Sequence, residues 1–124
     1  SRTYRLRQTV LKQLTKDHAL VQEHIDQGLL NADQAKNHPL KHVILRAVGI
    51  ADTLAVDTIQ GRVLPGDLFL LCTDGLSDML EDCQIQEIPV QNESLPARVD
   101  LLIDLAKAGG GYDNITAVLV EVGA

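Results

Sequence analysis

Two apolar segments constrain the fold most, because each has the length of a strand and meets a polar loop at one end. Residues 68–73 are apolar up to Thr73 and run directly into Asp74-Gly75. Residues 115–122 follow a triple glycine and Asp113-Asn114. Continuous apolar runs of this length are typical of strands that are buried on both faces of a sheet. We therefore predict a central strand at 68–73 and a last strand at 115–122, each with an aspartate where the strand meets a loop.

Length, composition and charge limit the number of domains and the classes of protein to which this chain can belong. With 124 residues it fits one domain or part of one, and its hydrophobic fraction of 45% is that of a globular protein. The net charge of −6 and the lack of a Lys/Arg cluster exclude an extended nucleic-acid surface. No apolar run approaches the roughly 20 residues of a membrane span, so we expect a cytoplasmic protein without a membrane partner.

The remaining sequence predicts alternating strands and helices, which is an α/β (α+β) pattern. Strands are expected at 3–7 and 9–14, and extended segments at 43–48 and 55–59. Helices are expected at 17–27, after Asn31, at 76–80, at 84–88 and from 94 to 108. Leu64-Pro65-Gly66-Asp67 is expected to form a turn, because Pro presets φ and Gly supplies φ > 0. Cys72 and Cys83 are expected to be reduced packing residues.

Several local signals set the helix ends. Thr15 or Asp17 is the expected cap of the helix at 17–27, and Gly28 ends it. Asn31 with Gln34 has capping-box spacing, and the helix that they begin is expected to stop before His38-Pro39. The helical pair at 17–37 is predicted to form a surface flap.

Each acidic pair also has an ordinary structural explanation. Asp-Gly is a common turn sequence, and an aspartate in a loop often binds nearby backbone amides. The combination favours a site, because neighbouring strands would bring both carboxylates to one edge of a sheet. Carboxylates are the ligands of hard cations such as Mg²⁺ and Mn²⁺. Asp74 and Asp113 are therefore candidates for half of a binuclear metal site.

The order of short motifs resembles a known family. The motifs are Leu14-Thr15-Lys16-Asp17-His18, Gly28, His38-Pro39, Arg46-Ala47-Val48-Gly49, Gly66-Asp67, Leu70-Leu71-Cys72-Thr73-Asp74-Gly75-Leu76-Ser77-Asp78 and Gly110-Gly111-Tyr112-Asp113-Asn114-Ile115-Thr116. Together they resemble the bacterial PPM-type, or protein phosphatase 2C-like, metal-dependent serine/threonine phosphatases. The resemblance covers nearly all of residues 1–124, but only the C-terminal half of that family's catalytic domain.

The resemblance implies a fold, an activity and roles for named residues. The fold is a four-layer αββα sandwich with two antiparallel sheets, to which residues 68–124 contribute metal-ligand strands and helices. Asp74 and Asp113 are implied to bind two or three Mg²⁺ or Mn²⁺ ions, and a metal-activated hydroxide attacks phosphoserine or phosphothreonine in proteins. The partners implied are a phosphorylated protein and an opposing serine/threonine kinase.

Other residues support more than one interpretation. Gly75, Asn114 and Asp78 are candidates for supporting the ligands, although Asp78 is more ordinary as the cap of the next helix. Arg46 is the best basic candidate for substrate contact, although an ion pair with a flap carboxylate is the more ordinary role. His18 is expected to make a structural hydrogen bond.

The family's N-terminal half, with a further Asp-Gly pair, has no counterpart in these residues. Ser1-Arg2 resembles the end of a Gly-Asp-Ser-Arg motif, so the chain is expected to be part of a longer enzyme and inactive alone. The alternative is a catalytically dead, phosphatase-like regulatory or binding module.

Overall fold

The structure is a computed structural model that describes residues 1–88 and 93–123. The chain divides into two units, a sheet unit formed by Ser1–Lys16 with Ile59–Ala124, and an inserted unit formed by Asp17–Thr58. The flap expected at 17–37 lies within the inserted unit. No helix among the described residues is long and apolar enough to cross a membrane.

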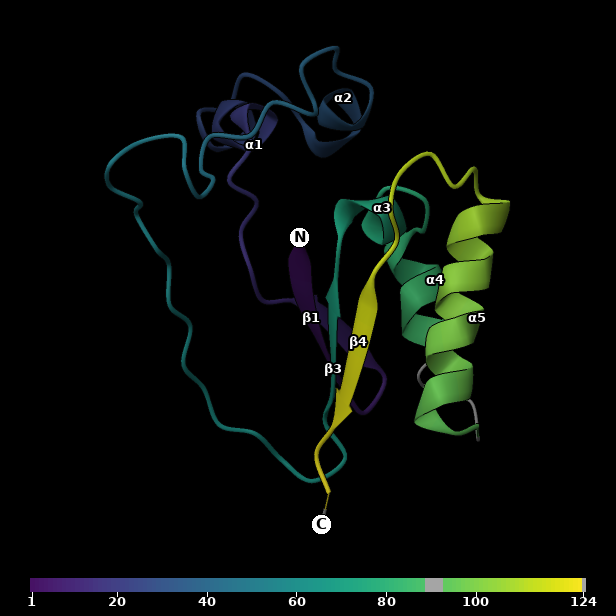
Figure 1. The fold of residues 1–124 in the computed structure, drawn as a ribbon. Helices are drawn as coiled ribbons and strands as arrows, with labels where there is room; N and C mark the ends of the chain where they lie inside the picture. The colour runs from purple at the N-terminus through teal and green to yellow at the C-terminus, as the bar shows by residue number, and fades with distance from the viewer. Residues whose placement is uncertain (89–92, 124) are drawn as a thin grey trace. The chain divides into compact units, whose positions relative to one another are not determined.

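The sheet unit contains a four-stranded antiparallel sheet in the order β2-β1-β3-β4 (Figure 1). Its strands are β1 (Arg2–Arg7), β2 (Val10–Gln13), β3 (Leu68–Cys72) and β4 (Ala117–Glu121). The predicted hairpin at the N-terminus is confirmed, and Gln8 turns it with φ of 56°. β3 is a central strand that pairs with β1 and with β4. The two apolar segments are therefore neighbours, as expected.

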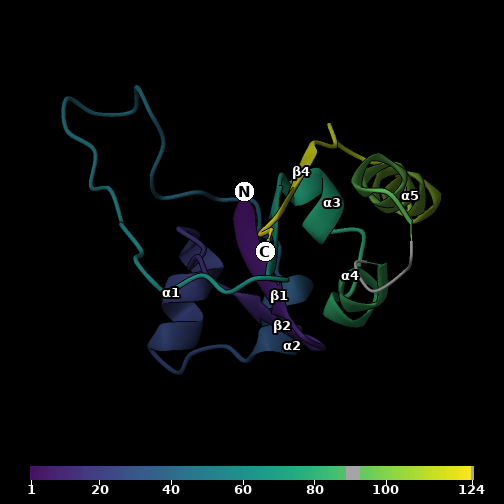
Figure 2. The ribbon, with the colours of Figure 1, turned by 90° about the horizontal axis from the view of Figure 1, so that it is seen from below.

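Helices cover one face of this sheet. They are α3 (Asp74–Ser77), α4 (Asp82–Glu87) and α5 (Leu95–Ala108), and all three lie on the same side of the sheet in Figures 1 and 2. The core between them is apolar and consists of Tyr4, Leu70, Cys72, Leu76, Leu80, Ile85, Ile88, Leu102 and Ala106. The strand predicted at 68–73 to be buried on both faces is covered on one face only by the described residues. Leu71, Val118 and Val120 are 43%, 50% and 47% exposed, because the described helices cover only the opposite face.

The predicted bounds of α5 are confirmed, whereas α3 and α4 each begin two residues earlier than predicted. Ser94 caps α5 by accepting a hydrogen bond from the amide of Ala97 at 3.4 Å, and proline lies in its first turn. β4 begins at Ala117, two residues later than expected. Cys72 is buried as predicted, whereas Cys83 is exposed, because the buried residue of the short helix α4 is Ile85. Both cysteines are free.

The turn before β3 is confirmed and has a second role. Gly66 has φ of 86°, and the amide of Asp67 donates to the carbonyl of Leu64 at 3.0 Å. The Asp67 side chain is only 1% exposed and receives two hydrogen bonds of 2.7 Å from Arg7. Arg7 and the amide of Leu64 hold the pKa of the Asp67 carboxyl at about 2, against the opposing effect of burial. The sequence indicated the turn but not this ion pair.

The inserted unit contains α1 (Leu20–Asp26) and α2 (Ala32–Lys36). The Asn31–Gln34 capping box is confirmed, and α2 ends before His38. The expected cap of α1 was wrong, because Ala19 occupies that position and makes no side-chain cap. The extended segments predicted at 43–48 and 55–59 form no strands, apart from one bridge between Ala19 and Ile44. Neither segment has a strand partner along its length in this unit.

Candidate metal centre

The site is built where the C-terminal end of β3 meets the N-terminal end of β4. These strands are antiparallel, and Cys72 pairs with Ala117 as their last matched residues at this end. Asp74 follows β3 by two positions, and Asp113 precedes β4 by four. The pairing register therefore brings both aspartate-bearing segments to one edge of the sheet, as the sequence predicted.

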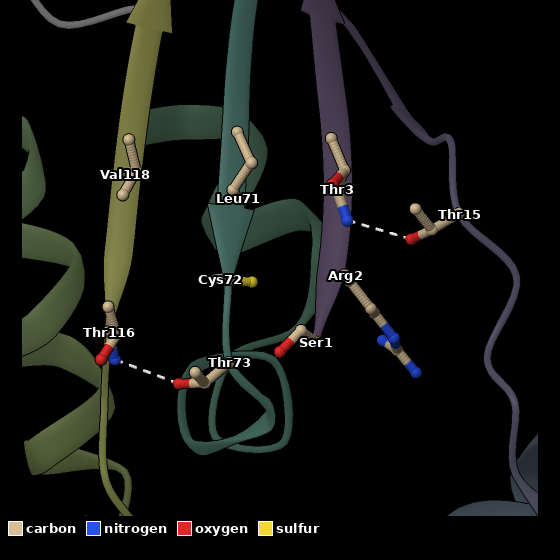
Figure 3. A pocket seen from close by; sticks show the side chains of 9 residues that line it. All are labelled: Ser1, Arg2, Thr3, Thr15, Leu71, Cys72, Thr73, Thr116 and Val118. Atoms are coloured by element: carbon tan, nitrogen blue, oxygen red, sulfur yellow. Dashed lines mark hydrogen bonds between the residues drawn. The ribbon is translucent and has the colours of Figure 1, made fainter. Parts of the chain in front are cut away.

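Thr73 ties the two segments together by three hydrogen bonds. Its amide donates to the carbonyl of Thr116 at 3.1 Å, and its hydroxyl accepts from the amide of Thr116 at 3.0 Å (Figure 3). The same hydroxyl donates to the carbonyl of Asn114 at 3.2 Å. A hydroxyl group donates and accepts at once, and this position requires both. No role was predicted for Thr73 from the sequence, although its place directly before Asp74 is the signal that marks it.

Gly75 brings the segments into backbone contact. A Cβ atom added at this residue would lie 2.1 Å from the carbonyl oxygen of Asn114 and 3.4 Å from the carbonyl carbon of Asp113. No side chain fits at that distance, so glycine is required here for close approach. The Asp-Gly pair is therefore the point at which the start of α3 packs against the loop before β4.

The two candidate ligands are both exposed and belong to short, well-defined segments. Asp74 is the first residue of α3, with Thr73 as its N-cap, rather than part of a loop as expected. Asp113 lies in the loop between α5 and β4, and its Oδ1 accepts a 2.7 Å hydrogen bond from the amide of Asn114. That bond orients the Asp113 carboxylate relative to the loop.

The chemistry of these donors fits part of a hard-cation site. Mg²⁺ and Mn²⁺ prefer oxygen ligands, and Mg²⁺ takes about six of them. In residues 1–88 and 93–123, no cluster of three or more His, Cys, Asp and Glu side chains is placed to hold a metal. A hard-cation site that includes Asp74 and Asp113 would therefore need further oxygen ligands.

Asp78 has a different place from the one predicted for it. It follows the last residue of α3, where its amide donates to the carbonyl of Asp74 at 2.8 Å. The N-cap of the next helix, α4, is instead Glu81, whose amide donates to the Gln84 side chain at 2.9 Å. The prediction of Asp78 as a helix N-cap was wrong, because two residues still separate it from the start of that cap.

An open depression of about 370 Å³ lies next to the site, on the sheet face opposite the helices. Figure 3 shows the side chains of Leu71, Val118 and Arg2 around it, with Thr73 and Thr116 at one end. Its lining is largely apolar. The depression therefore continues the uncovered face of the sheet up to Thr73 and Thr116.

Arg46 and His18 lie in the inserted unit, and both bind Asp57. Nη1 of Arg46 is 2.8 Å from Oδ1 of Asp57, and Nε2 of His18 is 2.7 Å from Oδ2. The hydrogen bonds from Arg46 and then His18 lower the pKa of the Asp57 carboxyl below its usual value. The structural hydrogen bond expected for His18 is confirmed. The ion pair expected for Arg46 is present, with a carboxylate that lies outside residues 17–37.

Comparison with known proteins identifies a group of bacterial relatives. No protein-family model matches the chain. The serine/threonine phosphatase stp of Listeria monocytogenes is 41% identical over 121 residues, which is 98% of this chain and 48% of the relative. The chain thus spans about half the length of this curated relative.

Solved structures agree with this assignment. A serine/threonine phosphatase from S. agalactiae superimposes with a TM-score of 0.94 at 36% identity, over 98% of this chain and 50% of that one. The catalytic domain of the serine/threonine protein phosphatase PstP, in complex with two manganese ions, gives a TM-score of 0.80 at 37% identity over 99% of this chain and 50% of that one. The motifs, the sheet and these relatives together show that the chain belongs to the PPM-type serine/threonine phosphatase family and corresponds to the C-terminal half of its catalytic domain.

Proposed function

We propose that this chain is part of a metal-dependent enzyme that removes phosphate from phosphoserine and phosphothreonine in proteins. The observation that carries the proposal is the packing of Gly75 against Asn114, which holds the segments of Asp74 and Asp113 together at one end of β3 and β4. The names of the relatives support this activity, as does their extent of identity. The substrates that we propose are proteins phosphorylated by a serine/threonine kinase.

Asp74 and Asp113 are the residues that would hold Mg²⁺ or Mn²⁺ in this enzyme. The manganese ions bound to PstP support this part of the proposal. Such ions, when bound, supply an activated hydroxide and offset the charge of the transferring phosphoryl group. Other residues of this chain hold the two aspartates in place. Thr73 and Gly75 hold the two segments at a fixed spacing, and the amide of Asn114 orients the Asp113 carboxylate.

The complete site needs ligands from outside these residues, and the missing half of the domain is the proposed source. Two carboxylates leave most coordination positions of a hard cation open to other protein oxygens, water or substrate. We therefore expect that the isolated chain does not hydrolyse phosphopeptides, whereas the protein with its upstream half does so when Mn²⁺ is present. Phosphate release measured with and without a chelator checks both statements.

The ligands are tested by substitution in the protein that contains the upstream half. Asp74→Asn and Asp113→Asn keep the shape of each side chain but remove its charge. Each is expected to weaken Mn²⁺ binding in calorimetry and to lower kcat/KM for a phosphopeptide by more than about 100-fold, since even outer partners of metal ligands contribute 10–100-fold.

Asp104→Asn is the matched control, because Asp104 is an exposed aspartate on α5. It is expected to bind Mn²⁺ and turn over substrate like the unaltered protein. Unchanged Mn²⁺ affinity in both ligand variants would contradict the proposed site. Binding of the phosphopeptide without any Mn²⁺-dependent release by the unaltered protein would instead identify the regulatory or binding module.

A further inference from the structure

A charged cluster in the inserted unit joins its first residues to its last. Arg46 donates through Nη1 to Oδ1 of Asp57 at 2.8 Å and to the carbonyl of Ala55 at 3.2 Å. His18 contacts the other carboxylate oxygen of Asp57 at 2.7 Å. His18 is the second residue of the unit and Asp57 the second from its end. One carboxylate therefore connects positions 39 residues apart in sequence.

Backbone hydrogen bonds already fix one side of this cluster. The amide of Leu45 donates to the carbonyl of His18 at 2.8 Å, and the amide of Leu20 donates to the carbonyl of Val43 at 3.0 Å. Residues 43–45 are thus held against residues 18–20. Residues 53–58 belong to no helix, strand or turn. The side chains of Asp57 and Arg46 attach this irregular stretch to the paired segments.

The same contacts close a loop. Arg46 precedes residues 47–54, and its guanidinium reaches the carbonyl of Ala55 and the carboxylate of Asp57 beyond them. A loop whose ends are held close together keeps a defined shape without regular secondary structure. This loop carries exposed apolar side chains, with Val48 at 91% and Ile50 at 65%.

We propose that Asp57, Arg46 and His18 form a clasp that closes the inserted unit and holds residues 47–56 in one conformation. In this role Arg46 is a positioning residue that acts through Asp57. The lowered pKa of the Asp57 carboxyl keeps it ionised at neutral pH, so that the clasp is charged under ordinary conditions. The proposal does not depend on phosphatase activity, because it concerns the order of one unit.

Hydrogen exchange in the full chain tests the clasp. Asp57→Asn removes the charge and preserves the shape of the side chain. The amides of Leu20 and Leu45, which lie beside the clasp, are expected to exchange about fivefold faster, the size of effect of a partly exposed ion pair. Amides of β3 serve as an internal reference and are expected to keep their rates, which shows that the variant is folded.

Asp52→Asn is the matched control, because Asp52 is an exposed aspartate of the same loop. It is expected to leave the amides of Leu20 and Leu45 unchanged. A second variant, Arg46→Gln, is expected to speed the same amides. In the double variant Asp57→Asn with Arg46→Gln, the combined effect is expected to be smaller than the product of the single effects, because the two residues share one interaction.

Two results would overturn the proposal. One is equal exchange of the Leu45 amide in Asp57→Asn and Asp52→Asn. The other is a double variant whose effect equals the product of the two single effects, which would mean that Arg46 and Asp57 act independently.

Discussion

At the scale of single residues, the candidate metal centre depends on two small side chains rather than on the aspartates alone. Gly75 allows the backbone of Asn114 to approach, and the Thr73 hydroxyl bonds to both neighbouring backbone groups. Asp74 and Asp113 are exposed and reach their places because these residues fix the segments that carry them. Two substitutions separate the framework of the site from its candidate ligands.

Gly75→Ala is expected to destabilise the fold by about 1–3 kcal/mol, the cost of forcing atoms into a packed site. The added methyl would lie 2.1 Å from a backbone oxygen, and a backbone group yields less easily than a side chain. Chemical denaturation measures the change. Gly61→Ala is the control, since a Cβ at Gly61 meets no atom within 4 Å. Equal stability of the two variants would contradict the packing point.

Thr73→Val removes the hydroxyl and preserves the branched shape. We expect a loss of about 1 kcal/mol in the free energy of unfolding, because the hydroxyl's hydrogen bonds with Asn114 and Thr116, both in the segment before β4, are lost. Thr73→Ser keeps the hydroxyl and is expected to lose less. If Thr73→Val unfolded at the same denaturant concentration as the unaltered protein, the hydroxyl would have no part in holding the segments.

At the scale of elements, an ion pair joins the end of β1 to the turn that precedes β3. Asp67 in that turn is buried and accepts two hydrogen bonds from Arg7. Arg7 also donates to the carbonyl of Arg62 at 3.0 Å, so it connects the strand to the segment that leads into the turn. Such a bidentate pair fixes direction as well as distance.

The pH dependence of stability follows from this pair. The Asp67 carboxyl has a pKa of about 2 in the folded chain, below its ordinary value of 3.8. Its contribution to stability is therefore fully present above the unfolded pKa and is lost as pH falls through about 2. Between pH 3.8 and about 2, acid is expected to lower the free energy of unfolding less in Asp67→Asn than in the unaltered protein, and denaturant titrations measure this difference. Asp104→Asn, the control, is expected to retain the full loss.

Elements whose determining signals lie within their own segment were predicted more closely than elements that depend on pairing with another segment. α5 and the β1–β2 hairpin were predicted closely, because capping, periodicity and turn residues lie within the segments themselves. The extended segments at 43–48 and 55–59 were not, because a strand needs a partner and none pairs with them along their length. The predicted cap of α1 was wrong for a related reason. Backbone hydrogen bonds from Leu20 to Val43 and from Leu45 to His18 hold the start of this helix.

At the scale of the whole molecule, the sheet unit has one covered face and one apolar face that the described helices leave open. Leu71, Val118 and Val120 lie on the open face, on the paired strands β3 and β4. Apolar patches of this kind on a sheet are surfaces of association. The sequence indicated that this face requires a further covering layer, because a strand with apolar residues on both faces requires a layer on each side.

The 124-residue chain alone is therefore expected to self-associate as its concentration rises, and sedimentation velocity measures this. Val118→Lys together with Val120→Lys places like charges on the open face and is expected to restore a monomer. Leu29→Lys is the control, because Leu29 is 65% exposed but belongs to the inserted unit. A chain that sediments as a monomer at every concentration would contradict the prediction.

The sequence by itself determined the class of the fold, the two aspartate-bearing strand ends and the family, because apolar runs, turn residues and motif order are local properties that need no partner. Only the tertiary structure decided that Gly75 meets Asn114, that Thr73 bridges β3 and β4, and that Arg7 closes on Asp67. These contacts join residues between 39 and 60 positions apart, and such pairings depend on strand register rather than on either segment alone.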